Sequence, residues 1–562
     1  MERGAAALIG VTSAGLGVAA GHVVAAFVAP AASPLPAVGA TVVDATPTPV
    51  REFAIRVFGP LDKTVLTGVI VLVVAALAVL AGILARRSLR QGLLLVGLLT
   101  LALVLAAMTR PGAAAVFALP GLVAGLVGGV ALALQLRWAC GPRVHLPAVR
   151  LPTPHEPTSY GSTPESPTPE GAGLGRLGSG RAGPGGAAPA APASIGGAAP
   201  GPRAATLDRR ALFVETAGVV VAAGLAGWAG TRLIGRGGVG GAVAPIPAVT
   251  LPPVASPPPA LPAGLETTVP GVSPLRTAIG DFYRVDTALS VPRPDPTTWT
   301  VSIGGRVAHP YALTMADLLA MPLVERDITL TCVSDPVGGP YCGSTRWTGV
   351  LVADLIRRAG PDPGADMVLS RSVDGFTAST PLAVLLDGRD AMIALGMDGR
   401  PLTATHGAPA RLLTPGLYGY VGATKWLTEL KVTTFAADTA YWTSRGWADH
   451  APVRTATRID TPAGTINAGQ VPIAGVAWAT HRGIGRVEVQ VDDGPWQPAT
   501  LGPDVGLDYW RQWYLPWAAA PGRHVLRARA YDASGQVQTA EVADVLPDGA
   551  TGYPVVDVTV RG

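Results

Sequence analysis

The chain has 562 residues, 49% of them hydrophobic and only 14% charged, and it contains 71 Gly and 54 Pro. This composition excludes a single soluble domain and indicates membrane-spanning segments joined to a soluble part. The formal net charge of +4 is small for the length and lies partly beside apolar segments, which argues against a nucleic-acid partner. Three Cys are too few for a disulfide scaffold.

The N-terminal part contains four apolar runs, each about long enough to cross a hydrocarbon core. They lie at residues 5–30, 64–85, 91–108 and 113–136, so residues 1–140 are predicted to be a four-helix transmembrane region. Arg86, Arg87 and Arg90 crowd the turn between the second and third runs. Under the positive-inside rule this turn and the N-terminus are cytoplasmic.

Other charged and metal-binding side chains in this region are few. Arg51, Arg56 and Lys63 lie in the first outside loop, against the trend of the positive-inside rule. His22 is the only histidine in the four runs, so a haem held by paired transmembrane histidines is not indicated. The simplest interpretation of the bundle is an anchor or a docking surface.

Two linkers flank a further apolar segment. Residues 141–206 are mostly Pro, Gly, Ala and Ser and predict a disordered cytoplasmic linker. Residues 207–234 predict a fifth transmembrane helix, and Arg209 and Arg210 before it resemble a twin-arginine signal for exporting folded, cofactor-loaded domains. Five spans place the rest of the chain outside the cytoplasm. Residues 235–274 are a Pro-rich, semi-extended linker.

The most informative stretch surrounds one cysteine. Residues 328–331 form a short β-branched run that predicts a buried strand, which delivers Cys332 to a Gly/Pro loop; Trp347 then leads into an apolar-periodic helix near residues 351–356. Three interpretations of Cys332 remain open on these residues. It is a small buried hydrophobe, half of a disulfide with Cys342, or a thiolate metal ligand.

The motifs TLTCVSDPVGG and TRWTGVLVADLI around Cys332 resemble the cofactor loop of the sulfite oxidase family of molybdenum enzymes. HGAPAR at residues 406–411, PG at 415–416 and TKWL at 424–427 resemble that family's later motifs, in the same order. The resemblance implies that residues 275–452 form a mixed α/β (α+β) molybdopterin-binding catalytic domain. It also implies a molybdenum–molybdopterin cofactor with Cys332 as the protein ligand to the metal.

The resemblance further implies roles for individual side chains. The implied catalytic residues are Cys332, Arg284 and Arg482, and the two arginines would hold the substrate. The pterin phosphate calls for cationic and main-chain N–H donors. The implied cofactor-binding residues are Cys332, Asp374, His406, Arg411, Thr424 and Lys425. On the residues alone, Arg284 is typical of a surface ion pair, Asp374 of a turn residue and His406 of a satisfied surface residue.

The C-terminal part changes to a two-residue period. Val487, Val489 and Val491 alternate with polar residues before a turn, and Leu526 to Ala530 do the same. This pattern predicts a β-sandwich of immunoglobulin-like class at residues 453–562. The segment around Arg482 resembles the dimerisation domain of sulfite oxidases, which implies a homodimer.

The implied activity is two-electron oxo transfer on a small sulfur oxyanion, outside the cytoplasm at the plasma membrane, with electrons passing to a separate cytochrome or quinone-linked partner. Two departures favour a neutral substrate. Residues 334–339 carry no arginine where sulfite oxidases have them, and Phe376 stands in place of a pocket tyrosine. A sulfoxide reductase on the same fold is therefore one alternative. The other is a cofactor-free envelope binding module with a Cys332–Cys342 disulfide.

Overall fold

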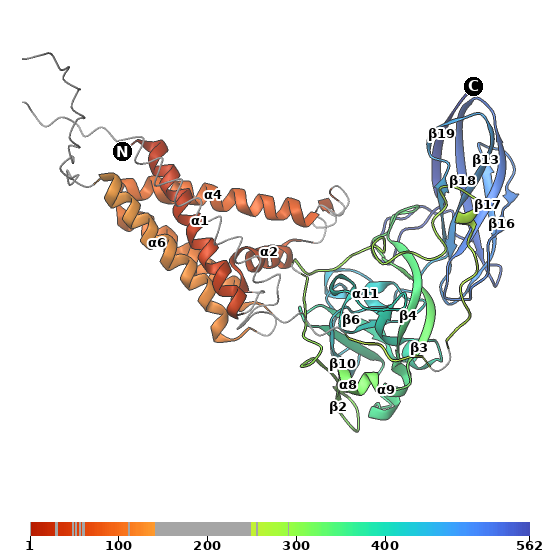
Figure 1. The fold of residues 1–562 in the computed structure, drawn as a ribbon, viewed down its shortest axis with the longest axis horizontal. Coiled ribbons are helices and arrows are strands. Elements are labelled where there is room, and N and C mark those ends of the chain that lie inside the picture. Colours follow the sequence, from red (N-terminus) through yellow and green to blue (C-terminus); the bar gives the residue numbers. More distant parts are fainter. Residues whose placement is uncertain are drawn as a thin grey trace, which may run out of the picture.

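The computed structural model describes residues 2–28, 32–47, 62–110, 113–140, 249–254, 257–289 and 291–562, together with residues 50, 53, 54 and 58. A helical part and a larger, strand-rich part lie side by side (Figure 1). The predicted linker at 141–206 and the fifth helix with its twin-arginine pair, at 207–234, lie outside the described residues.

Apolar helices form the N-terminal part. They are α1 (Arg3–Val28), α2 (Pro34–Ala45), α4 (Asp62–Arg87), α5 (Leu89–Met108) and α6 (Ala118–Cys140), with the 3-10 turn η3 (Ala115–Phe117) before the last. Among the described residues, four helical stretches are long and apolar enough to cross a membrane, at Arg3–Val28, Lys63–Arg87, Leu89–Met108 and Ala115–Ala139. Their positions match the four runs predicted from the sequence.

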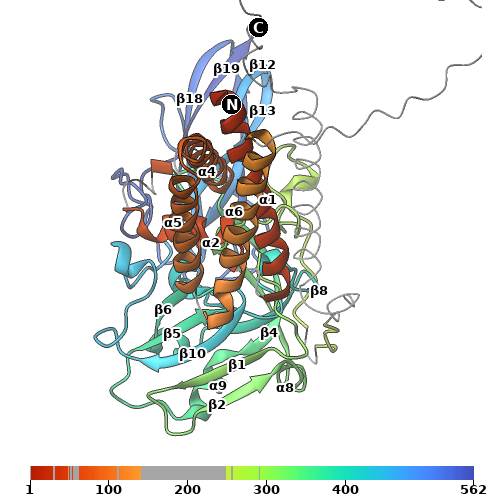
Figure 2. The same ribbon diagram turned by 90° about the vertical axis from the view of Figure 1, so that its left-hand side faces the viewer.

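Glycines let these helices approach closely. A Cβ at Gly10 of α1 would lie 2.0 Å from the Ala78 carbonyl oxygen of α4, and one at Gly17 would lie 2.4 Å from the Ala124 oxygen of α6. Small residues at such crossings allow backbone contact that larger side chains prevent. Helix α1 therefore packs directly against both α4 and α6 (Figure 2).

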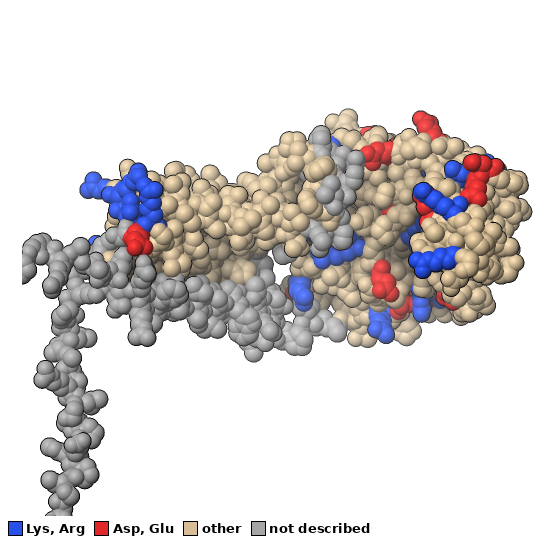
Figure 3. Space-filling model, turned by 90° about the horizontal axis from the view of Figure 1, so that it is seen from above, with Lys and Arg blue, Asp and Glu red and all other residues tan. Residues whose placement is uncertain are grey.

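The two ends of the helical part differ in charge. Arg86 and Arg87 end α4, Arg90 opens α5 and Arg137 ends α6. Lys and Arg gather at the end of the helical part that is remote from the strand-rich part (Figure 3). The opposite end, with α2 and the start of α4, faces the strand-rich part (Figure 1).

Two sheets build the middle of the chain, the first mixed and the second antiparallel. One has the order β2-β1-β10-β5-β6, and the other has the order β3-β4-β7-β8 with β9 also paired to β7. The strands are β1 (Thr300–Gly305), β2 (Tyr311–Thr314), β3 (Val324–Thr331), β4 (Cys342–Leu351), β5 (Met367–Ser372), β6 (Thr377–Pro381), β7 (Met392–Met397), β8 (Arg400–Pro401), β9 (Arg411–Leu413) and β10 (Leu427–Thr433). The helices are η4 (Leu265–Thr267), α8 (Met315–Leu319), α9 (Val352–Ala359), α10 (Leu382–Leu386), η5 (Ala404–His406), α11 (Gly419–Gly422) and η6 (Thr443–Arg445).

Local sequence explains several of these elements. Helix α8 begins with a capping box in which Thr314 and Asp317 each accept the other's backbone N–H. Helix α9 follows the strand that contains Trp347, as predicted, and ends at Gly360, whose φ of 66° suits glycine. A hairpin joins β1 to β2, with its turn at Gly305 and the residues after it.

The C-terminal part consists of two further sheets, β11-β13-β17-β16 and β12-β19-β18-β14-β15. Their strands are β11 (Ala456–Thr461), β12 (Gly464–Asn467), β13 (Gly469–Trp478), β14 (Ile484–Val491), β15 (Gln497–Pro498), β16 (Thr500–Leu501), β17 (Arg511–Ala519), β18 (Gly522–Asp532) and β19 (Val555–Arg561). The alternating residues named above pair directly, with Val487 opposite Ala530 and Val489 opposite Ala528. Side chains of both sheets share one core around Trp513, which is inaccessible to solvent.

The described part of the Pro-rich segment, residues 249–254 and 257–274, packs against the sheets that follow it. Leu251 packs on the core of the first sheet, and Leu261 on the core that joins the middle and C-terminal parts. Arg346 donates to the carbonyl oxygens of Pro258 and Pro259. Residues 257–274 therefore run along the strand-rich part rather than acting as a spacer.

Candidate cofactor site

Strand β3 brings Cys332 to the end of a sheet. The backbone N–H of Cys332 donates to the Tyr341 carbonyl at 2.9 Å, which continues the β3–β4 ladder by one residue. The thiol is free and half-buried, with its Sγ 2.9 Å from Ser334 Oγ. Burial raises the pKa of the Cys332 thiol, so a cation is needed to stabilise its thiolate.

Cys342 lies on the other face of the same hairpin. It pairs with Thr331, and because neighbouring residues of a strand face opposite sides, Cys332 points away from it. Cys342 is buried and free, with its Sγ 3.5 Å from Thr331 Oγ1. The predicted alternative of a Cys332–Cys342 disulfide is therefore wrong.

A buried guanidinium forms part of the same region. The side chain of Arg411, the first residue of β9, lies 5.1 Å above the ring of the fully buried Trp347. Arg411 donates to the His406 carbonyl at 3.2 Å, while its buried Nε has no hydrogen-bond partner among the described residues. Burial lowers the pKa of Arg411 to about 10. An unpaired N–H on a buried cation is a ready partner for an anion.

Lys425 supplies a second buried cation. Its Nζ lies 2.7 Å from Asp286 Oδ2 and 4.8 Å from the ring of Trp426, and 11% of the side chain is exposed. Burial lowers the pKa of Lys425 to about 8 in spite of Asp286, and the neighbouring Arg411 adds to the lowering. The positive charges of Lys425 and Arg411 therefore lie within mutual electrostatic reach.

His406, Gly407 and Thr424 lie beside Arg411 and Lys425, and these five residues form one wall of the candidate site. The His406 Nε2 lies 3.0 Å from the Ile279 carbonyl oxygen. Gly407 has a φ of 103°, and a Cβ there would lie 3.0 Å from the Cα of Lys425, so only glycine fits without strain. Thr424 is inaccessible, and its hydroxyl lies 2.7 Å from Ser370 Oγ, so it supports the wall from the core side.

The three other residues predicted for the site lie in different elements. Arg284 is near Lys425, because its Nε donates to the same Asp286 oxygen at 2.7 Å. Asp374 lies in the β5–β6 turn, where it accepts the Phe376 N–H at 3.3 Å. Arg482 belongs to the C-terminal sheets, and its guanidinium bonds to Asp532 at 3.2 Å.

Arg482 also donates to the Val453 carbonyl and to Thr455, each at 3.0 Å. Its guanidinium is thus held by the C-terminal part itself. The structure brings together Cys332, His406, Arg411, Lys425 and Arg284, and gives Arg482 a separate set of partners.

Sequence reasoning missed Tyr283, Asp335 and Arg458. Burial, and then the neighbouring Cys332, raise the pKa of Tyr283, whereas Arg411 lowers it, so Tyr283 is within electrostatic reach of both groups. Asp335 accepts the Tyr341 N–H at 2.8 Å, and burial raises its pKa to about 6. In the sequence, only the position of Tyr283 beside Arg284 pointed to a role in the site. The strand pattern around Arg458 gave no indication that this residue would contact the loop after Cys332.

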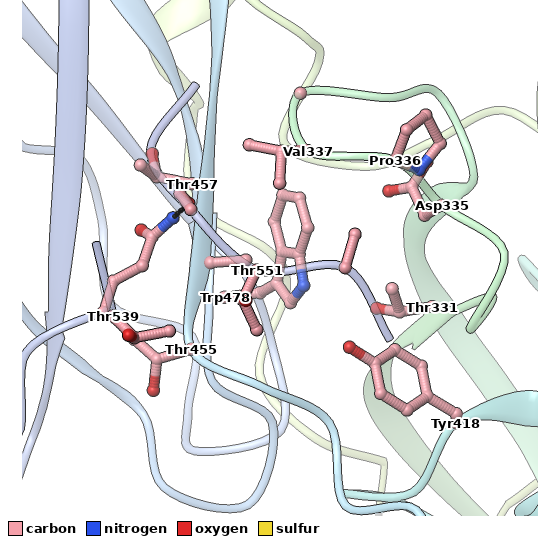
Figure 4. A pocket seen from close by; sticks show the side chains of 15 residues that line it. Thr331, Asp335, Pro336, Val337, Tyr418, Thr455, Thr457, Trp478, Thr539 and Thr551 are labelled. Carbon is pink, nitrogen blue, oxygen red and sulfur yellow. Dashed lines mark hydrogen bonds between the residues drawn. The ribbon is translucent and has the colours of Figure 1, made fainter. Parts of the chain in front are cut away.

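Arg458 of β11 joins the loop after Cys332 to the C-terminal sheets. It donates to the Gly339 carbonyl at 3.0 Å and to Ser273 at 2.8 Å, beside a cleft of about 350 Å³. A smaller cavity of about 30 Å³ lies between the same loop and Trp478 (Figure 4). The loop that replaces the family's arginines is therefore fixed by contacts with the C-terminal part.

The comparisons with known proteins match the part of the chain that contains this site. The family model described as "Oxidoreductase molybdopterin binding domain" matches residues 288–442. The uncharacterized oxidoreductase YuiH of Bacillus subtilis is 32% identical over 139 residues, which are 25% of this chain and 67% of that protein. Human mitochondrial sulfite oxidase is 26% identical over 310 residues, or 46% of this chain, and the chain spans about half (56%) of its length.

Among solved structures, the sulfane dehydrogenase SoxCD of Paracoccus pantotrophus is 21% identical, with a TM-score of 0.44, over 53% of this chain and 85% of that one.

These matches define the class: an oxidoreductase with a molybdopterin-binding domain. The chain belongs to the sulfite oxidase family of molybdopterin oxidoreductases, and its cofactor is molybdenum–molybdopterin. The residues fit that group, because a free thiol can ligate the metal and the unpaired Nε of Arg411 can meet a phosphate.

Proposed function

We propose that the chain is a membrane-anchored oxidoreductase that carries out two-electron oxo transfer on a small sulfur oxyanion. The observation that carries this proposal is the free Cys332 thiol at the end of β3, beside a wall that holds buried Arg411 and Lys425. When bound, the cofactor supplies a metal that changes its oxidation state by two and exchanges an oxygen atom with the substrate. Cys332 would ligate the metal, and the buried cations would hold the phosphate.

The described residues also support roles in excluding water and in fixing the substrate side. Tyr283 and its stacked neighbour Phe282, 5.4 Å away between ring centroids, would cover the site beside the thiol and the guanidinium. Phe282 packs edge-on against Trp347 at 5.6 Å, which anchors this cover in the core. The loop after Cys332 would line the substrate side, because Arg458 fixes it from the C-terminal part.

A sulfoxide is the second candidate substrate, and the charges around Cys332 favour it. No arginine follows Cys332 in residues 333–339, and the nearest acidic group, Asp335, is buried. The Arg482 guanidinium is engaged by Asp532, and Arg284 by Asp286. A neutral substrate needs no compensating cation, whereas a sulfite-like anion loses charge-assisted bonds of roughly 1.5 to 3 kcal/mol each.

We further propose that the catalytic part lies outside the cytoplasm, against the outer end of the bundle. The arginines Arg86, Arg87 and Arg90 are at the remote end, which the positive-inside rule assigns to the cytoplasm. Residues 275–452 would form the catalytic domain, and 453–562 an immunoglobulin-like domain suited to dimerisation. Electrons would pass to a separate cytochrome or quinone-linked partner.

The test is metal and pterin analysis of the full-length protein, made in a host that synthesises the cofactor. Wild type should hold about one molybdenum per chain, and Cys332→Ser should lose or markedly change its metal-centre spectrum. Cys342→Ser is the matched control, because that thiol is buried on the opposite face and should not matter. Absence of molybdenum from a folded wild type, or identical behaviour of the two variants, would reject the proposal.

The direction of transfer is then read from two assays on the same preparation. Sulfite oxidation consumes water and yields sulfate, two protons and two electrons, which a dye acceptor takes up. Sulfoxide reduction consumes two protons and two electrons from a reduced dye and yields a sulfide and water. Turnover in the second assay alone would decide for the sulfoxide.

A further inference from the structure

Lysine is very rare in this chain. Lys63, Lys425 and Lys431 are its only lysines, whereas the Lys and Arg residues together number 42. Two of the three meet at one carboxylate, that of Asp286, although one comes from a membrane helix and the other from the catalytic part. The Asp286 side chain is 3% exposed, so this meeting point is buried.

The position of Lys63 is unfavourable for its own helix but favourable for the contact with Asp286. It lies in the first turn of α4, where a positive charge opposes the helix dipole. Its Nζ lies 2.8 Å from Asp286 Oδ1, and it also donates to the backbone carbonyls of Asp286 at 2.9 Å and Ala288 at 3.0 Å. These contacts tie the first turn of α4 to the segment from Asp286 to Ala288.

The other carboxylate oxygen faces the cofactor side. Asp286 Oδ2 accepts from Lys425 at 2.7 Å and from Arg284 at 2.7 Å. Three cations thus surround one carboxylate. A phosphate monoester carries about −1.5 to −2 at neutral pH, so a cluster rich in cations suits it.

A second contact makes the docking of the bundle independent of Lys63. Asp44 near the end of α2 lies 3.4 Å from the Tyr441 hydroxyl and 3.8 Å from Arg445, both in the catalytic part. Gly39 of α2 faces Leu289, whose Cδ1 would lie 2.8 Å from an added Cβ. Loss of Lys63 alone therefore leaves the bundle attached.

We propose that Lys63 is a positioning residue through which the membrane bundle completes the phosphate-binding cations of the cofactor site. It holds Asp286 by one oxygen and so sets the position and charge of Lys425, which the other oxygen binds. This inference rests on the proposed function, because it takes the cofactor phosphate as the partner of Lys425. The membrane helices thereby act on cofactor retention as well as anchoring the chain.

The test compares Lys63→Met with Lys431→Met in the full-length protein in detergent. Lys431 is a matched control, because it pairs with Asp438 at 2.8 Å and has a similar exposure, 36% against 33%, but does not contact Asp286. Cofactor release is followed after dilution by the fluorescence of the oxidised pterin. We expect Lys63→Met to release the cofactor about fivefold to tenfold faster than wild type. This factor corresponds to the loss of one partly exposed, charge-assisted hydrogen bond.

Two further measurements separate positioning from mere docking. Lys63→Arg keeps the charge and should restore at least part of the retention. Amine labelling with mass spectrometry on cofactor-free protein reads Lys425 directly, and its labelling should rise in Lys63→Met but not in Lys431→Met. Release and labelling equal to wild type in Lys63→Met would overturn the inference. A wild type without molybdenum would instead overturn the proposed function.

Discussion

Replacing Arg482 distinguishes the role expected from the sequence from the role that the structure supports. A substrate-holding arginine should affect KM, whereas the structure gives Arg482 a structural role in the C-terminal sheets. Its partner Asp532 has a fully inaccessible side chain, and Arg482 itself is 35% exposed. We therefore expect Arg482→Ala to destabilise the C-terminal sheets and to leave KM unchanged.

The magnitude follows from the remaining partners of Asp532. Breaking a buried ion pair by removing one partner usually costs about 3 to 5 kcal/mol. Here Asp532 keeps bonds from the Ser534 N–H and hydroxyl and from the Gln536 N–H, and solvent screens part of the pair. We expect the free energy of unfolding to fall by about 2 kcal/mol. For a unit of the size of residues 453–562, this lowers the melting temperature by about 8 °C.

The loss should also depend on pH. Burial alone would raise the pKa of Asp532, but hydrogen bonds from Ser534, Gln536 and Arg482 lower it below its ordinary value of 3.8. A depressed acid pKa stabilises the fold above about pH 4, and this contribution disappears as the pH falls further. The difference in melting temperature between wild type and Arg482→Ala should therefore shrink below pH 4.

The assay is thermal unfolding of the detergent-solubilised chain, with Asp532→Asn and the double variant completing a cycle. The double variant should be less destabilised than the sum of the two single variants, because the pair is then removed together. An unchanged melting temperature together with a raised KM for sulfite or a sulfoxide would refute this reasoning and return Arg482 to the substrate pocket.

Two other predictions concern the wall that holds Arg411 and Lys425. Gly407→Ala should lower both molybdenum content and melting temperature, because the added Cβ would displace Lys425. The control is Gly388→Ala, where φ is a similar 97° and an added Cβ meets no atom within 4 Å. This control should add only backbone strain of about 1 kcal/mol and keep the metal. Trp347→Ala should cost about 3 to 5 kcal/mol and speed cofactor release, because the inaccessible ring supports the Arg411 guanidinium; wild-type release in a folded variant would contradict that support.

Local patterns predicted the elements that carry the site. The β-branched run before Cys332 is β3, and the periodic segment after Trp347 contains α9. The alternation at Val487 and Val489 is that of β14. Each of these depends on neighbours within a few residues, which is where hydrophobic periodicity carries information.

The long-range partners of the charged residues could not be predicted in this way. Lys63 and Asp286 are separated by 223 positions, and Arg458 and Gly339 by 119. No periodicity links residues so far apart, and a single charged residue in a polar stretch reads as a surface group. The assignment of Arg482 to the substrate stayed a prediction from resemblance. Its partner Asp532 lies 50 positions further along the chain, at the end of β18, which pairs with β14.

The opposite facing of Cys332 and Cys342 bears on oxidation chemistry. Outside the cytoplasm, neighbouring thiols tend to be joined, and a joined Cys332 would be lost as a metal ligand. Here the pleat of the β3–β4 hairpin sets the two sulfurs back to back, so joining them requires the end of the hairpin to unravel. In the folded chain, the backbone geometry of the hairpin therefore prevents a disulfide between Cys332 and Cys342, even before the cofactor binds.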